Sequence, residues 1–213
     1  MKRPRVLLAD DHRMVAEGLK SLLSDEFELL GVVEDGRALV EAARKLRPDV
    51  IVADITMPHL NGIDALVRLK SDEIQVPVVF LTMHVEVAYA RRALEAGAAG
   101  YVLKHSAPAE LVTAIRAALD GRTYVSPAVA GDVLRVINQK PEKADDPVAS
   151  LTPRQREILQ LLSEGRSAKE IGDTLAISSR TVEFHKYQVM EKLNLHTNAE
   201  LVHFSLKNGI AEI

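Results

Sequence analysis

The chain has 213 residues, of which 47% are hydrophobic and 27% are charged, and its formal net charge is -3. This length allows one or two domains, and the composition is that of a folded globular protein, which excludes disorder throughout the chain. There are no cysteines, so disulfides, thiol catalysis and cysteine-ligated zinc or iron-sulfur sites are excluded.

The amino terminus is basic, but the apolar stretch that follows it is soon interrupted by Asp10 and Asp11. This pattern predicts a strand and not a signal peptide. No run approaches the roughly 20 apolar residues that are needed to cross a bilayer. We therefore expect a soluble protein without a membrane partner, and the absence of cysteine suits a cytoplasmic location.

Strand and helix patterns alternate from residue 5 to about 120, which predicts five strand-helix units. One strand is predicted from Phe27 to Val33. The other four are apolar runs that each end in a reactive polar residue: 5–9 before Asp10 and Asp11, 50–53 before Asp54, 78–81 before Thr82, and 101–103 before Lys104. Alternation of this kind is typical of an α/β fold with a five-stranded, doubly wound parallel sheet.

In a parallel sheet covered by helices, functional groups gather beyond the carboxyl ends of the strands, so these polar residues are expected to form one site. Three carboxylates packed together repel each other unless they share a proton or bind a cation. Because the ligands are oxygens, Asp10, Asp11 and Asp54 are predicted to bind Mg2+. A carboxylate can also attack a phosphoryl group while a metal, a lysine and a hydroxyl stabilise the transferring oxygens. Asp54 is the predicted nucleophile, with Lys104 and Thr82 contacting the phosphoryl oxygens.

Each of these residues also has an ordinary structural interpretation. Asp11 could cap a helix that begins near His12, Lys104 could be a solvated lysine at a strand end, and Thr82 could reflect β propensity. An aspartate-nucleophile phosphatase or phosphotransferase would use the same groups. Such enzymes usually need a second acid two residues after the nucleophile, where this chain has Thr56. We therefore do not expect an enzyme.

The pattern changes after Gly121. A helix is predicted from Ser126-Pro127 through Ile137, and the polar segment from Asn138 to Asp146 is predicted to be a linker. No strand is predicted from Leu151 onward. The expected division is an α/β domain over residues 1–122, a helical linker over 123–147, and a small all-α domain over 148–213.

Cap signals divide the last third of the chain into short helices. Thr152 and Ser167 predict the starts of the first two helices, and Ser178 or Ser179 predicts the start of a longer one. Asn198 opens the last helix. A short helix, a tight turn and a longer helix make a helix-turn-helix.

Both halves of the chain resemble a two-component response regulator of the NarL/FixJ type, with a flavodoxin-like receiver domain and a LuxR-type DNA-binding domain. The receiver resemblance rests on Asp10-Asp11, residues 54–58 with Gly62, Thr82 and Lys104, and the output resemblance rests on residues 151–157, 179–185 and 192–193. The resemblance implies that a sensor histidine kinase phosphorylates Asp54 with the help of Mg2+. It also implies a homodimer when phosphorylated, which binds double-stranded DNA and regulates transcription.

The resemblance also suggests how the signal leaves the phosphorylated site. Tyr101 resembles the family's switch aromatic, which turns inward when the threonine, here Thr82, moves toward the phosphoryl group. It could instead be an ordinary core aromatic. Thr56 and His84 occupy positions where the family's side chains flank the phosphoryl group and influence its hydrolysis.

The predicted DNA-binding domain is not globally basic, because from Ser150 to Ile213 acidic and basic residues are equal in number. Phosphate contact depends on the local distribution of charge, and basic residues lie along the predicted recognition helix. The residues predicted to contact DNA all lie on or near this helix: Arg180, Thr181, Lys186 and Lys192 at phosphates, and Glu183, Phe184 and Tyr187 near base edges. A neutral domain predicts weak binding as a monomer, so dimerisation is the expected control step.

The family's dimer contact lies on the last helix, where the corresponding residues are Asn198, Leu201, Val202 and Leu206. The resemblance also allows the unmodified receiver to cover the recognition helix. Two alternatives stay open: a phosphorylation-independent DNA-binding protein with a degenerate receiver, and a helical hairpin that binds protein and not DNA.

Overall fold

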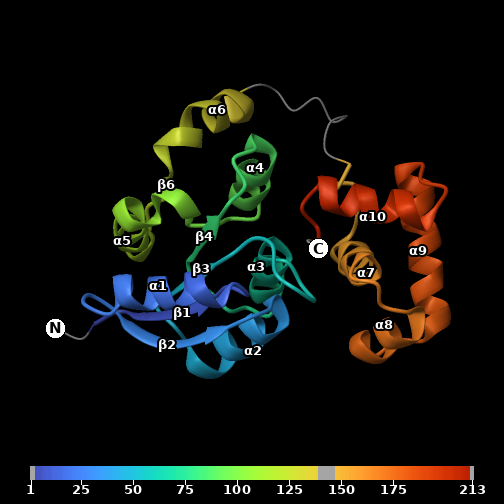
Figure 1. Cartoon of the computed structure of the whole chain (residues 1–213), viewed down its shortest axis with the longest axis horizontal. Coiled ribbons are helices and arrows are strands. Elements are labelled where there is room, and N and C mark those ends of the chain that lie inside the picture. Colours follow the sequence, from blue (N-terminus) through green and yellow to red (C-terminus); the bar gives the residue numbers. More distant parts are fainter. Residues whose placement is uncertain (1–2, 139–146, 212–213) are drawn as a thin grey trace.

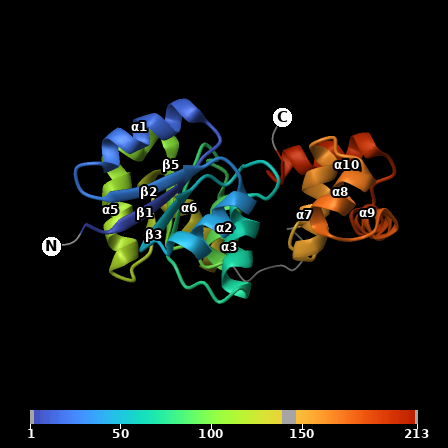
Figure 2. The same ribbon diagram turned by 90° about the horizontal axis from the view of Figure 1, so that it is seen from below.

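The computed structural model of the chain describes residues 3–138 and 147–211. Its first part is a six-stranded parallel sheet covered by helices on both faces (Figures 1 and 2), so the doubly wound α/β prediction is confirmed. The strand order is β2-β1-β3-β4-β5-β6. The strands are β1 (Arg5–Ala9), β2 (Glu28–Val33), β3 (Val50–Ala53), β4 (Val78–Thr82), β5 (Gly100–Leu103) and β6 (Tyr124–Val125).

Helices divide between the two faces of this sheet. They are α1 (Arg13–Leu23), α2 (Gly36–Leu46), α3 (Gly62–Ser71), α4 (Val87–Glu95) and α5 (Ala107–Leu119), with a short 3-10 helix at Lys104–Ser106. One hydrophobic core joins the sheet to α2, α3 and α4, and the other joins it to α1 and α5. In β3, Ile51 belongs to the first core and Val52 to the second, because successive side chains of a strand point to opposite faces.

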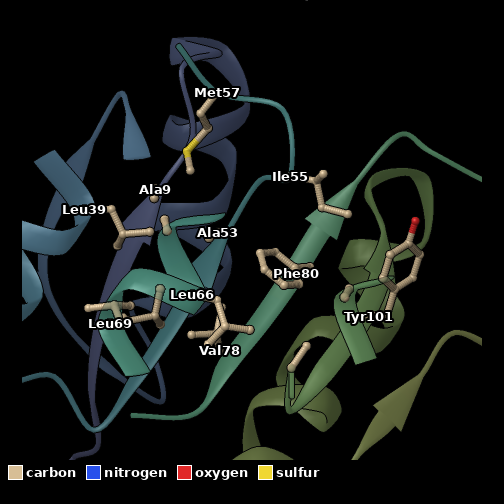
Figure 3. Close-up of a cluster of buried hydrophobic side chains, with 14 of the residues drawn as sticks. Ala9, Leu39, Ala53, Ile55, Met57, Leu66, Leu69, Val78, Phe80 and Tyr101 are labelled. Carbon is tan, nitrogen blue, oxygen red and sulfur yellow. The ribbon is translucent and has the colours of Figure 1, made fainter. Parts of the chain in front are cut away.

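The first core packs directly beneath the carboxyl ends of the central strands. Figure 3 shows Phe80 of β4 and Tyr101 of β5 in this core beside Ile55, which follows β3 by two residues. All three side chains are fully buried. Buried side chains of this size hold the strand ends rigidly, and the strand ends carry the predicted site.

The sheet has one strand more than the five that were expected. β6 has only two residues, which is too short for a periodic pattern to reveal, and it pairs with Gly100 and Tyr101 of β5. The predicted helix after Ser126-Pro127 is confirmed as α6 (Pro127–Asn138). Its residues Val129 and Val133 are buried in the first core and α6 contacts α4, so this segment packs against the α/β domain beyond the boundary predicted at residue 122. Residues 139–146 of the predicted linker lie outside the described residues.

Residues 147–211 contain helices and no described strand, as predicted. These helices are α7 (Pro153–Ser163), α8 (Ala168–Leu175), α9 (Ser179–Leu193) and α10 (Asn198–Lys207). Thr152 and Ser167 form capping boxes, and Ser178 caps α9. The turn between α8 and α9 contains Ala176 in a left-handed conformation with φ of 52°. The arrangement of α8, turn and α9 confirms the helix-turn-helix.

The α/β domain and this helical domain touch each other through α3 and α7, which lie side by side in Figures 1 and 2. Two ion pairs join them, one between Arg37 and Glu157 and one between Arg156 and Asp64. Within the described ranges, no helix combines the length and hydrophobicity that crossing a membrane requires.

Candidate functional site

The polar residues predicted at four strand ends lie together in the structure. Asp10 and Asp54 directly follow β1 and β3, Thr82 is the last residue of β4, and Lys104 follows β5. Asp10, Asp54 and Thr82 are buried, whereas Asp11 is partly exposed. The backbone amide of Asp54 donates to Ala9 O at 2.8 Å, so the pairing of β3 with β1 continues to the residue that carries the carboxylate. Parallel strands therefore bring distant parts of the sequence to one edge, as predicted.

Lys104 connects two of the carboxylates. Its Nζ lies 2.5 Å from Asp54 Oδ2 and 2.9 Å from Asp10 Oδ2. The second oxygen of Asp54, Oδ1, accepts a hydrogen bond from Ile55 N at 2.6 Å. Both oxygens of Asp54 are thus held in place. Oδ2 lies next to the Lys104 ammonium, which would also attract an incoming anionic group.

The electrostatics of this pair reflect its burial. Burial raises the pKa of Asp54 to about 6, although Lys104 opposes the rise, and Asp10 adds to it. Burial lowers the pKa of Lys104, but the neighbouring carboxylates of Asp54 and Asp10 outweigh this effect and raise the pKa overall. Three carboxylates share this pocket with one ammonium group, so a further cation would reduce the repulsion among the carboxylates.

The chemistry of the available ligand atoms fits Mg2+. Carboxylate oxygens of Asp10, Asp11 and Asp54 and a ring nitrogen of His12 lie within 4.8 Å of one another. Asp10 Oδ2 and Asp11 Oδ1 are both buried; Asp10 Oδ2 lies 2.9 Å from Lys104 Nζ, and Asp11 Oδ1 lies 2.9 Å from His12 Nδ1. Several carboxylate oxygens gathered at one place are what a hard divalent cation requires. His12 itself precedes α1 and is half exposed, in keeping with a residue at a helix start.

Thr82 and Tyr101 meet at the backbone of His84. Thr82 Oγ1 accepts from His84 N at 3.1 Å, and the Tyr101 hydroxyl donates to His84 O at 2.8 Å. Tyr101 is fully buried and points inward, and burial raises the pKa of its hydroxyl above the ordinary value. Thr56 Oγ1 lies 2.7 Å from His84 Nε2, so the residues two positions after Asp54 and Thr82 are hydrogen-bonded to each other.

The residues predicted to bind DNA lie on the outer side of α9, with differences among them. Phe184 and Tyr187 are 58% and 67% exposed, whereas the apolar Val182 and Val189 face the core. Arg180, Glu183 and Lys192 are exposed, and Thr181 and Lys186 are partly buried. Thr181 Oγ1 lies 2.8 Å from the hydroxyl oxygen of the cap residue Ser178, and Lys192 Nζ donates to Ser150 O at 3.1 Å. These two side chains therefore already have partners within the domain.

The face predicted for dimerisation on α10 needs one correction. Leu201 is only 2% exposed and packs in a core with Leu159 and Val189, so its prediction as a dimer contact is wrong. Helical spacing shows which residues share a face, but it does not show which apolar face turns inward. Asn198 is exposed, and Val202 and Leu206 are partly exposed.

The suggestion that the α/β domain covers the recognition helix is also wrong for this structure. The α/β domain contacts α7 and the end of α10, while α9 lies on the far side of the helical domain in Figures 1 and 2. The exposure of Phe184 and Tyr187 agrees with this arrangement.

Comparison with known proteins gives matches to two family models and to full-length relatives. The response regulator receiver domain matches residues 6–116, and the luxR family of bacterial regulatory proteins matches residues 149–205. The transcriptional regulatory protein MctR of Rhizobium johnstonii is 39% identical over 208 residues, covering 97% of this chain and 94% of MctR. The response regulator UvrY of Escherichia coli is 33% identical, covering 96% of this chain and 94% of UvrY.

Solved structures of response regulators also align with nearly the whole chain. A structure of the RcsB response regulator of Salmonella typhimurium aligns with a TM-score of 0.65 at 27% identity, covering 96% of this chain and 97% of that one. An RcsB–DNA complex aligns with a TM-score of 0.60 at 26% identity, covering 95% and 98%. Both parts of this chain therefore have counterparts in one solved protein.

Proposed function

Because the chain belongs to the response regulators that join a receiver domain to a LuxR-family DNA-binding domain, we propose that phosphorylation of Asp54 controls its DNA binding. The family consists of transcriptional regulators and not of enzymes. The observation that carries the proposal is the buried Asp54 carboxylate, paired with Lys104 beside two further aspartates.

The residues of this pocket account for phosphoryl transfer from a sensor histidine kinase. An oxygen of Asp54 attacks the phosphorus of a phosphohistidine, so a P–O bond forms as the P–N bond breaks and the histidine leaves. Mg2+ held by Asp10, Asp11 and Asp54 would neutralise charge on the transferring group. The Lys104 ammonium then exchanges part of its contact with Asp54 for a phosphoryl oxygen, and the Thr82 hydroxyl donates to another.

The switch is proposed to run through Thr82 and Tyr101. Thr82 Oγ1 and the Tyr101 hydroxyl now hold the amide and the carbonyl of His84, respectively. A Thr82 hydroxyl that turns toward a phosphoryl group changes its contact with His84, and Tyr101 responds because it is tied to the same residue. A phosphoryl group thus shifts the population of two conformations of this segment.

For the output, we propose that α9 enters the major groove of double-stranded DNA. Arg180, Thr181, Lys186 and Lys192 are assigned to phosphates, and Glu183, Phe184 and Tyr187 to base edges, with Thr181 and Lys192 changing their present contacts. A homodimer formed after phosphorylation would use the exposed side of α10, with Asn198, Val202 and Leu206. A domain with balanced charge binds a single half-site weakly, so pairing two domains supplies the affinity. A cytoplasmic location stays a prediction.

Intact-mass measurement after incubation with Mg2+ and a small acyl phosphate tests this function. We expect one phosphoryl group on the wild type and none on Asp54→Ala, with dimerisation of the wild type alone. DNA selected from a random pool by the phosphorylated protein should bind the wild type more tightly than Asp54→Ala. If no phosphoryl group is incorporated and DNA binding is intact, the receiver is degenerate and regulates independently of phosphorylation.

A further inference from the structure

Two aromatic residues and a carboxylate share the exposed side of α9. The chain has four phenylalanines and four tyrosines, all of them in the described part, and only Phe184 and Tyr187 among these are largely exposed. They are three positions apart and therefore lie on one side of the helix. Glu183 is exposed beside them, four positions before Tyr187. Glu183, Phe184 and Tyr187 are here called the reading face.

The buried side of α9 keeps the reading face turned outward. Val182 and Val189 are 0% and 1% exposed, and they belong to two different hydrophobic cores of the helical domain. Two such anchors fix the rotation of the helix about its own axis. The Phe184 ring also meets the His185 ring edge-on, with 5.9 Å between centroids. The reading face is therefore presented without any rearrangement of the domain.

Charge alone does not draw the reading face to DNA. Glu183 Oε2 lies 4.0 Å from Lys186 Nζ, so a carboxylate on the same helix partly balances the charge of this lysine. Glu191 adds a second exposed carboxylate further along α9. A carboxylate beside DNA phosphates is repelled unless it gains a favourable contact. Binding by α9 therefore depends on what the base edges offer to Glu183 and to the two aromatic rings.

The major groove offers few partners to a carboxylate. Only the amino groups of cytosine and adenine present hydrogens there. In adenine the amino group stands beside N7, an acceptor that repels a carboxylate, so cytosine is the better partner for Glu183. Guanine and thymine present acceptors in this groove, and they would leave the carboxylate desolvated without a hydrogen bond.

The aromatic members of the reading face fit a different base. Phe184 has no hydrogen-bonding group, and the apolar group of the major groove is the thymine methyl. Contact between this methyl and the rings of Phe184 and Tyr187 removes apolar surface from water on both sides. From Glu183 to Tyr187 the helix rises about 6 Å, and base pairs are about 3.4 Å apart, so the reading face covers roughly three successive base pairs.

We infer that the reading face sets the base sequence of the half-site, with Glu183 selecting a cytosine and Phe184 and Tyr187 selecting thymine beside it. This inference rests on the proposed function, in which α9 enters the major groove. Glu183 also acts against other sequences, because its charge then faces acceptors or phosphates without compensation. One residue of the helix thus supplies both the attraction to the right sequence and the penalty for the wrong one.

Selection of double-stranded DNA from a random pool tests the role of Glu183, using the full chain treated with Mg2+ and a small acyl phosphate. We expect the wild type to enrich cytosine next to thymine. Glu183→Gln should enrich adenine in place of cytosine, because an amide donates to N7 and accepts from the amino group. It should bind the wild-type sequence about tenfold more weakly and unselected DNA more tightly. Glu191→Gln removes the same charge elsewhere on α9 and should keep the wild-type preference.

Uracil in place of thymine tests the aromatic residues, since uracil lacks only the methyl group. This replacement beside the selected cytosine should weaken wild-type binding about fourfold, the factor for burial of one methyl group. The double variant Phe184→Ala, Tyr187→Ala should bind the thymine and uracil duplexes equally. Uracil at a thymine outside the half-site is the control, and thermal melting checks that each variant is folded.

Two results would overturn the inference: enrichment of the same sequence by the wild type and by Glu183→Gln, or full wild-type affinity for the uracil duplex. In both cases the wild type would still bind its selected DNA, so the proposed function would stand. If the wild type enriched no sequence and bound no DNA with or without a phosphoryl group, the proposed function itself would fail. The exposed aromatic pair would then be a contact for protein.

Discussion

Lys104 Nζ lies 2.5 Å from Asp54 Oδ2, in a pocket where both side chains are less than a tenth exposed. The ion pair joins residues that are 50 positions apart in the chain. In the proposed reaction, an ammonium held this close to the attacking oxygen is already in place to stabilise charge on the transferring phosphoryl group, so the free energy of reorganisation would be small.

Lys104→Met should slow incorporation of a phosphoryl group by at least about 100-fold, because a preorganised positive charge is lost from the pocket. The rate of mass increase with Mg2+ and an acyl phosphate measures this effect. Lys45→Met, at an exposed position on α2, is the matched control and should react at the wild-type rate. Equal rates for Lys104→Met and the wild type would show that Lys104 has no part in the transfer.

Mg2+ should raise the melting temperature of the wild type, because a ligand that binds only the folded state stabilises it by about 2.7 kcal/mol at 100 times its Kd. Asp11→Asn should weaken this stabilisation, since it removes a charged ligand from the cluster. Differential scanning calorimetry with and without a chelator measures it. Asp25→Asn, at an exposed site after α1, should respond to Mg2+ as the wild type does. A Mg2+ response that Asp11→Asn leaves intact would remove Asp11 from the site.

Arg180→Ala should weaken binding to all DNA sequences alike and reduce the slope of log affinity against log salt by about 1, because one phosphate contact is lost. Affinities of the phosphorylated protein at several salt concentrations measure the slope. Lys207→Ala, at the end of α10, removes the same charge away from α9 and should leave the slope unchanged. A loss confined to particular sequences would instead indicate that Arg180 reads a base.

Val202→Glu should prevent dimerisation of the phosphorylated protein while the domain stays folded, because Val202 lies partly exposed on α10. Sedimentation measures the oligomeric state, and intact mass confirms that the variant is still phosphorylated. Lys207→Glu, on the same helix, is the control for charge, since it changes the net charge by −2 and Val202→Glu changes it by −1. Dimers of normal stability in Val202→Glu would place the dimer interface elsewhere.

Leu201→Ala should lower the free energy of unfolding and not act on dimerisation, since Leu201 lies in the same buried core as Leu159 and Val189. Removing a buried leucine costs about 2–5 kcal/mol of the free energy of unfolding. Urea unfolding measures this loss, and Val202→Ala should cost much less. If Leu201→Ala kept full stability but lost the dimer, the original assignment of Leu201 to the interface would be restored.

The sequence by itself determined which polar residues gather at the candidate site and the elements that carry them. Apolar runs that end in Asp10, Asp54, Thr82 and Lys104 place these residues at one edge of a parallel sheet, because strand polarity is fixed by the alternating pattern. Helix caps such as Thr152 are equally local, since their hydrogen bonds reach only three residues along the chain. Inferences of this kind depend on short-range chemistry, which a sequence displays directly.

Only the tertiary structure decided which surfaces meet. β6 is too short to show a period, and the inward side of α10 depends on where the neighbouring helices pack. Gln160 and Asn61 are 99 positions apart, and neither belongs to a motif that predicts their hydrogen bond. A polar side chain can meet either water or another domain at similar free energy, so its partner is set by the relative placement of domains and not by its own type.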